Sequence, residues 1–268
     1  MTTIKIGILN LMYNKIETNE NFYKSLTHEH SEIEFTYYYS ATRYVDRKLD
    51  PEILDKMRPL NLNEIDQFDG FIISGSPIEK IAFSDVTYNN EINDLLDKLN
   101  KLSIPQLYVC WGAMAALNHL YGINKKILPH KAFGVFQNHI LADSDLLDGI
   151  SDNFPAPHAR YAEMDQQQIN NNPHLKINAI NDKGLLFLAE AENKPQSFLF
   201  SHLEYQKNDL KKEFDREYAA HPEQNPIQPS NYYSPLTQKP VFAWEDIQAK
   251  FFGNWVEQVI TAKLKVCC

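Results

Sequence analysis

The sequence predicts an α/β fold with a mainly parallel sheet and helices on both faces. Strand-like and helix-like segments alternate through the first half of the chain, which is typical of β–α–β units. The strand-like segments are also continuous apolar runs, as expected for parallel strands buried on both faces. No repeat, low-complexity tract or linker interrupts the 268 residues, so we expect one domain over residues 1–268.

Four segments of the first half have the composition of buried strands, being apolar or rich in β-branched and aromatic residues. In chain order they are Ile4–Leu9, Ile33–Tyr39, Phe68–Ser74 and Ile104–Cys110. Three helices are predicted between or after them, the second because its apolar residues recur at helical spacing. These helices are Ile16–Leu26, Asn90–Leu102 and Trp111–Leu120.

The second half contains more strand-like sequence than the first. Its predicted strands are Phe133–Leu141, Leu175–Ile180, Leu185–Ala189 and Ser197–Ser201. A helix over Asp209–Ala220, a long proline-containing loop over His221–Pro240 and a closing helix over Phe251–Leu264 complete the chain.

Composition and charge exclude several classes of protein. The formal charge of −9 argues against nucleic-acid binding, which needs clustered Lys and Arg. No apolar run is long enough for a membrane span, and the N-terminus reads as a buried strand without a cleavage site. The three cysteines, two of them at the C-terminal positions Cys267 and Cys268, do not form a disulfide framework. We therefore expect a cytoplasmic protein with reduced thiols.

Cys110 lies where a predicted strand meets a predicted helix. Open α/β sheets place their sites at the carboxyl ends of the strands, and a helix N-terminus stabilises a thiolate. Gly112 leaves room for the tight turn of a nucleophile elbow. The alternative is a packed core thiol, because free cysteines are among the most buried side chains.

A second candidate is the segment FLFSHLEYQ, residues 198–206. His202 and Glu204 stand two residues apart at the end of a predicted strand and would point to the same side. A carboxylate beside a histidine fixes its tautomer and stabilises the imidazolium. Together with Cys110 they form a plausible Cys–His–Glu triad, although an unrelated surface pair is the alternative.

Two further groups carry weaker signals. His158 and Arg160 in APHARY could bind an anion or simply satisfy each other. The acidic residues from Asp143 to Asp152 lack the ligand spacing of an EF-hand, so we predict no metal site.

Ordered blocks over most of the chain resemble one known family. They include ILNLM near the start, FDGFIISGSPIE, CWGA around Cys110, KAFGVFQNHIL, PHARYAE and HLEY. From about Lys5 to about Val259 the chain resembles the homoserine O-acyltransferases, which comprise homoserine O-succinyltransferases and O-acetyltransferases. The resemblance implies a flavodoxin-like, doubly wound sheet similar to that of class I glutamine amidotransferases.

The resemblance also implies a two-step acyl transfer. Cys110 would take the acyl group from an acyl-CoA, and an amino-acid hydroxyl would then attack the thioester, with His202 accepting protons while Glu204 orients it. The N–H of Trp111, with one from the loop Ser74–Glu79, would form the oxyanion hole. By position, Lys131, Arg160 and Arg216 match family residues that line the site, and the two arginines are candidates for the acceptor carboxylate.

Glu79 indicates the acyl donor. Acetyl-using members resemble this chain there, whereas succinyl users tend to carry glycine, and a carboxylate would repel and displace a succinyl carboxylate. Acetyl-CoA is thus the expected co-substrate, with no bound cofactor and no metal. The product, an O-acetyl amino acid, would serve cysteine or methionine synthesis.

Several positions depart from the family pattern and bear on the acceptor. They are Met114, Gln137, Asn138 and Glu245. Because one methylene is discriminated by only ~1–3 kcal/mol, few changes could convert a homoserine site to a serine site. We therefore expect L-serine slightly ahead of L-homoserine as acceptor.

Three other functions stay as alternatives. They are a homoserine O-succinyltransferase, a glutamine amidotransferase-like hydrolase and a non-catalytic module of the same fold. The sequence leaves open whether the chain is a monomer or a homodimer.

Overall fold

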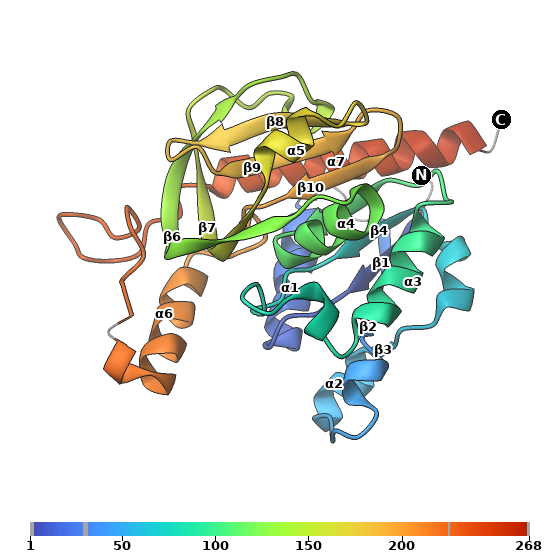
Figure 1. Cartoon of the computed structure of the whole chain (residues 1–268), viewed down its shortest axis with the longest axis horizontal. Helices are drawn as coiled ribbons and strands as arrows, with labels where there is room; N and C mark the ends of the chain where they lie inside the picture. The colour runs from blue at the N-terminus through green and yellow to red at the C-terminus, as the bar shows by residue number, and fades with distance from the viewer. Residues whose placement is uncertain (1–2, 29–31, 225, 267–268) are drawn as a thin grey trace.

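A computed structural model describes residues 3–28, 32–224 and 226–266. Cys267 and Cys268 lie outside the described residues. The described strands form one ten-stranded mixed sheet, in the order β3-β2-β1-β4-β5-β10-β9-β8-β6-β7 (Figure 1). No helix in these ranges is both long and apolar enough to cross a membrane.

Six strands are parallel to one another, from β3 to β10 in the sheet order. They are β1 (Ile4–Leu9), β2 (Ile33–Tyr39), β3 (Arg58–Pro59), β4 (Gly70–Ile73), β5 (Gln106–Val109) and β10 (Gln196–Leu199). The sequence predicted all of these except β3, which is only two residues long. The chain passes from β1 outward to β3 and then returns to β4 on the other side of β1, and this reversal is where α/β folds place their sites.

Helices cover both faces of the parallel strands, as the sequence predicted. On one face, α1 (Lys15–Leu26) and α7 (Glu245–Val266) cover the alternate strand residues that include Ile6, Ile72 and Leu199. On the other, α3 (Asn89–Leu99) and α4 (Trp111–Tyr121) cover the residues between them, such as Phe71 and Phe198. The two-residue period of a strand thus sends successive apolar side chains into two separate cores.

The remaining strands are antiparallel, and the structure differs from the sequence prediction most here. They are β6 (Lys125–Ile140), β7 (Phe154–Met164), β8 (Leu175–Asn181) and β9 (Leu186–Ala191). The strand β6 begins eight residues before the predicted segment, and β7, which carries His158 and Arg160, was not predicted as a strand. A mainly parallel sheet therefore describes the first half of the chain, and a mixed sheet describes the whole.

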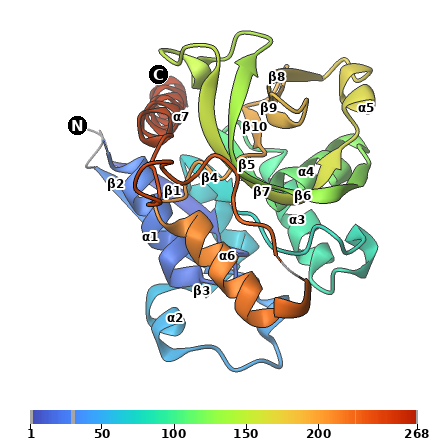
Figure 2. The ribbon, with the colours of Figure 1, turned by 90° about the vertical axis from the view of Figure 1, so that its left-hand side faces the viewer.

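Three further α-helices lie in the described residues: α2 (Pro51–Lys56), α5 (Gln166–Asn170) and α6 (Asp209–Ala220). The sequence predicted α6 but neither of the two short helices. Helix α6 packs beside α1, where the Asn21 amide donates a hydrogen bond to Asp209 at 2.7 Å (Figure 2). It also lies next to the hairpin of β6 and β7, so it closes one side of the space above the sheet edge.

Candidate active site

Cys110 occupies a strained backbone position between β5 and α4. Its φ of 49° and ψ of −110° are unfavourable for a residue with a side chain. Two hydrogen bonds maintain this conformation: the Cys110 N–H donates to the carbonyl of Leu199 at 2.7 Å, and its carbonyl accepts from the N–H of Met114 at 3.0 Å. The thiol is thus held at the carboxyl edge of the sheet, in the strand-to-helix geometry of a nucleophile elbow.

Two glycines allow the backbone to approach this cysteine closely. A Cβ at Gly112 would lie 2.7 Å from the carbonyl oxygen of Ile73, a backbone atom that cannot move aside. A Cβ at Gly75 would lie 3.1 Å from the His202 ring and 3.3 Å from the Cys110 Cβ. The loop after β4 therefore lies directly against both the thiol and the imidazole.

His202 and Glu204 meet as predicted, although not at two positions of one strand. The strand β10 ends at Leu199, and His202 begins a tight turn in which its carbonyl accepts from the Tyr205 N–H at 3.0 Å. Within this turn His202 Nδ1 lies 2.7 Å from Glu204 Oε1. Both residues are almost fully buried, with 2% and 1% exposure.

The imidazole is oriented and charged by its two neighbours. Because a carboxylate only accepts, Nδ1 carries the proton toward Glu204, and Nε2 is left to interact with the Cys110 side chain. Burial disfavours the imidazolium, but the charges of Cys110 and Glu204 and hydrogen bonds to both outweigh it. Together they raise the pKa of His202 well above its usual range. Glu204 Oε2 is buried without a hydrogen-bond partner in the described part of the chain, so the imidazole is the main partner of this carboxylate.

Helix α7 and the residue before it, Trp244, fix the turn that carries these two residues. The Gln248 amide donates to the carbonyls of Leu203 and, at 3.1 Å, Tyr205. The Trp244 indole N–H donates to the same Tyr205 carbonyl at 2.9 Å. The sequence assigned neither residue a role at the site, because they lie about forty positions after the turn.

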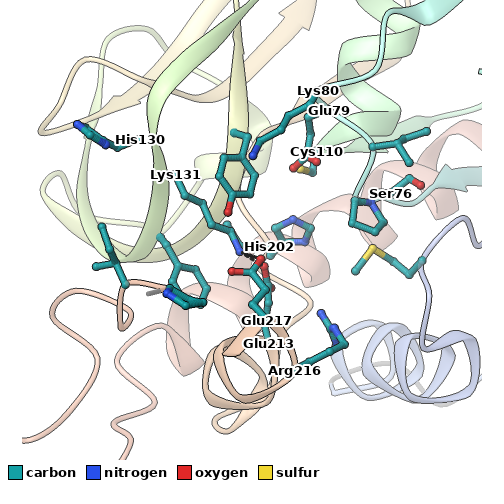
Figure 3. Close-up of a pocket in the computed structure, with 18 of the residues that line it drawn as sticks. Ser76, Glu79, Lys80, Cys110, His130, Lys131, His202, Glu213, Arg216 and Glu217 are labelled. Carbon is teal, nitrogen blue, oxygen red and sulfur yellow. Dashed lines mark hydrogen bonds and ion pairs between the residues drawn. The ribbon is translucent and has the colours of Figure 1, made fainter. Parts of the chain in front are cut away.

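Cys110 and His202 open into a pocket of about 560 Å³ (Figure 3). Its walls come from the loop after β4, the start of β6 and one side of α6. Of the residues singled out from the sequence, five line it: Glu79, Cys110, Lys131, His202 and Arg216. Glu204 is not among the lining residues and contacts His202 through Nδ1.

Lys131 lines the pocket, but its ammonium group is held by two carboxylates of α6. It binds Glu213 at 2.6 Å and also Glu217. Burial disfavours the Lys131 ammonium, yet the charges of the two carboxylates raise the pKa of Lys131. Burial also disfavours the Glu213 carboxylate, yet the charge of Lys131 holds the pKa of Glu213 below its usual value. One cation therefore faces two carboxylates, and the cluster keeps one net negative charge. Neither Glu213 nor Glu217 was identified from the sequence.

Glu79 projects from the opposite wall and is buried, with 6% exposure. Burial, with the nearby charge of Glu213, raises the pKa of Glu79 despite opposing effects of His202 and Lys131. The Lys125 ammonium donates to the Glu79 backbone carbonyl at 2.7 Å and anchors this loop. The Glu79 side chain lies near Cys110 at the pocket wall, as Figure 3 shows.

Arg216 stands one turn after Glu213 on α6 and is exposed at the pocket wall. Its guanidinium donates to no acceptor within residues 3–28, 32–224 and 226–266. This position leaves its planar donor fork available to a carboxylate ligand.

Arg160 requires a correction, because it does not reach the pocket. It is fully buried in β7, where its guanidinium binds Glu163 at 2.7 Å and the carbonyls of Phe200 and Leu186 at 3.0 and 2.8 Å. It also donates to His158 Nδ1 at 2.6 Å. The pair belongs to a buried structural network, although the Arg160 Nε has no hydrogen-bond partner among the described residues, and Arg160 does not line the pocket where an acceptor carboxylate would bind.

The positions that depart from the family pattern also lie outside the pocket lining. Met114 is a residue of α4 and is buried in the core. The Asn138 side chain binds His158 at 3.1 Å. Gln137 and Glu245 are exposed. The expectation that these changes reshape the acceptor pocket is therefore not supported by direct contact.

Two backbone N–H groups are available beside Cys110. Those of Trp111, the first residue of α4, and of Gly75 donate to no acceptor in the described residues. Their position beside the sulfur suits an oxyanion hole. Within the described ranges, no group of three or more His, Cys, Asp or Glu residues converges as metal ligands would.

The fold places this chain in a class of α/β proteins similar in structure to glutamine amidotransferases. A glutamine amidotransferase from Thermotoga maritima superposes with a TM-score of 0.67 at 10% identity, over 97% of this chain and 99% of that one. A glutamine amidotransferase from Methylobacillus flagellatus gives 0.58 at 14% identity, over 98% of this chain and 95% of that one. These likenesses confirm the predicted fold class.

Sequence comparison then assigns the family. The family model described as homoserine O-succinyltransferase matches residues 1–265. A serine O-acetyltransferase of Lactobacillus acidophilus is 47% identical over 97% of each chain, and one of Lacticaseibacillus casei is 42% identical over 96% of this chain and 95% of the relative. A homoserine O-acetyltransferase of Ruegeria sp. is 34% identical over 96% of this chain and 82% of the relative. The chain belongs to the homoserine O-succinyltransferase family, which confirms the family expected from its motifs.

Proposed function

We propose that this protein transfers an acetyl group from acetyl-CoA to the side-chain hydroxyl of L-serine through a thioester on Cys110. The observation that carries the proposal is the buried Cys110–His202–Glu204 group at the base of a pocket that also presents Arg216 and a net negative cluster. The names of the two most similar relatives described above, both serine O-acetyltransferases, support the same substrates.

The first half-reaction uses Cys110 as the nucleophile and His202 as the proton donor. The Cys110 thiolate attacks the thioester carbonyl, and the N–H groups of Trp111 and Gly75 stabilise the resulting oxyanion. Collapse breaks the bond to the CoA sulfur, which takes the proton from His202 Nε2 and leaves as CoA–SH. Acetyl-Cys110 and a neutral imidazole remain.

The second half-reaction runs through the same atoms. The serine hydroxyl attacks the thioester carbonyl while His202 Nε2 accepts its proton. Collapse breaks the carbon–sulfur bond, releases O-acetylserine and restores the thiolate beside an imidazolium. The product carries a good leaving group at its β-carbon, so it fits a precursor for sulfur incorporation in cysteine synthesis.

Helix α6 is suited to bind the acceptor's zwitterion. Glu213 and Arg216 are three residues apart and therefore share a face of the helix. The net negative charge around Lys131 attracts the ammonium group, and the free guanidinium of Arg216 binds the carboxylate. We assign Lys131 to holding the carboxylates of α6 rather than to direct contact with substrate.

Replacing Arg216 by alanine is expected to raise the KM for serine about 10- to 100-fold, the cost of one lost charge-assisted hydrogen bond. The KM for acetyl-CoA should change little. Lys211→Ala removes a surface ion pair from the same helix and serves as the control. Steady-state kinetics with serine and homoserine measure both the effect and the preferred acceptor. An unchanged serine KM, or a preference for homoserine above tenfold in kcat/KM, would contradict this assignment.

Glu79 is expected to select acetyl over succinyl donors by occupying the space that a succinyl carboxylate needs. This volume is filled in either protonation state of the side chain. Glu79→Gly should therefore shift the ratio of succinyl-CoA to acetyl-CoA turnover upward by about tenfold or more, whereas Glu79→Gln keeps the volume and the acetyl preference. Donor competition measures this ratio, and a wild-type preference for succinyl-CoA would refute the acetyl assignment.

A further inference from the structure

Tyr205 joins the two halves of the proposed site without belonging to the triad. Its ring stacks on the His202 imidazole with centroids 4.5 Å apart and an interplanar angle of 28°. Its hydroxyl donates to Glu213 Oε2 at 2.9 Å. One side chain thus contacts both the proposed general base and the carboxylate proposed to bind the acceptor ammonium.

The backbone of Tyr205 is fixed from three directions. Its N–H donates to the His202 carbonyl, and its own carbonyl accepts from Trp244, just before α7, and from Gln248 of α7. Burial, with the charge of Glu213, raises the pKa of Tyr205 well above its usual range, so the hydroxyl stays protonated and donates. The ring therefore acts as a rigid spacer between the turn at His202 and helix α6.

We propose that Tyr205 is a positioning residue that sets the distance between the acceptor ammonium at Glu213 and the proton-accepting nitrogen of His202. This inference rests on the proposed function, since it assumes that Glu213 binds the acceptor. Serine carries its ammonium and hydroxyl on adjacent carbons, so both must be placed together. A misplacement of about 1 Å can lower a rate about 10²-fold. Acetylation of Cys110 involves no acceptor ammonium and needs only the His202–Glu204 pair.

The test separates the two half-reactions in the variant Tyr205→Phe, which keeps the stacked ring and removes the hydroxyl. We expect the rate of acetyl-Cys110 formation from acetyl-CoA to stay within about twofold of wild type. Transfer from acetyl-Cys110 to serine should slow about tenfold or more, with a raised KM for serine. Hydrolysis of acetyl-Cys110 by water should not change, because water has no ammonium to position.

Tyr232→Phe is the matched control, because it removes a buried tyrosine hydroxyl that donates to the Lys207 carbonyl outside the pocket. An equal slowing of both half-reactions in Tyr205→Phe would show a merely structural role and overturn the inference. If neither half-reaction slowed, the inference would also be overturned. The variant Glu213→Gln distinguishes a failure of the positioning role of Tyr205 from a failure of the acceptor subsite. If it raises the serine KM while Tyr205→Phe has no effect, only the positioning role fails. If it leaves the serine KM unchanged, the acceptor subsite itself is wrong and the inference fails with it.

Discussion

Replacing Cys110 by alanine is expected to abolish acetyl transfer, lowering kcat by about 10³-fold or more, because no other side chain of the pocket can hold the acetyl group as a thioester. Acetyl-CoA should still bind, since the pocket walls are unchanged. The measurement is CoA release with acetyl-CoA and serine, followed under saturating concentrations of both.

The control for this variant is its thermal unfolding. Alanine fits the space of cysteine, so the Tm should change by only a few degrees. Turnover within tenfold of wild type in a folded Cys110→Ala protein would show that acetyl passes directly from CoA to the acceptor. The proposed thioester would then be wrong.

Replacing Glu204 by glutamine is expected to change both the rate and its pH dependence. Glu204 helps to raise the pKa of His202, and in acetyl-Cys110 the sulfur no longer carries charge, so Glu204 is the carboxylate that maintains this effect. Serine attack needs a neutral imidazole and is lost as the pH falls through the His202 pKa. Removing the carboxylate lowers that pKa, so the acid limb of kcat/KM for serine should move to lower pH.

The same variant should reduce kcat by about 10²-fold or more, because the tautomer and orientation of His202 are no longer enforced. Glu190→Gln replaces another carboxyl, a half-buried one that accepts from Ser197 away from this pocket, and should leave the profile unchanged. An acid limb that stays in place or moves to higher pH in Glu204→Gln would contradict the assignment of His202 as the base for serine.

The parallel half of the fold could be predicted because its strands are buried on both faces and read as apolar runs. The antiparallel half could not be predicted as fully, and β7 shows why. Its prolines Pro155 and Pro157 argue against a strand, yet β7 pairs only with β6 at the edge of the sheet, where a missing N–H is tolerated. A proline excludes a central strand, but the sequence does not say which strand is at the edge.

The residues of the candidate site could likewise be predicted only in part from the sequence. Cys110, His202 and Glu204 could be found because each follows a strand-like run, and parallel strands bring their carboxyl ends to one edge. Arg160 was misassigned, because a motif does not reveal whether a guanidinium faces the pocket or the core. Glu213 and Gln248 carry no local signal, and only the packing of α6 and α7 brings them to the turn that contains His202 and Tyr205.

The most direct test of the proposed Cys110 thioester follows an isotopically labelled acetyl group through the enzyme. Acetyl-CoA is mixed with the enzyme alone, the reaction is quenched, and the labelled peptide is identified by mass spectrometry before and after a chase with serine or homoserine. We predict one acetyl group on Cys110 that passes to serine during the chase, faster than to homoserine. Label on another residue, or O-acetylserine formed at full rate while Cys110 carries no acetyl group, would contradict it.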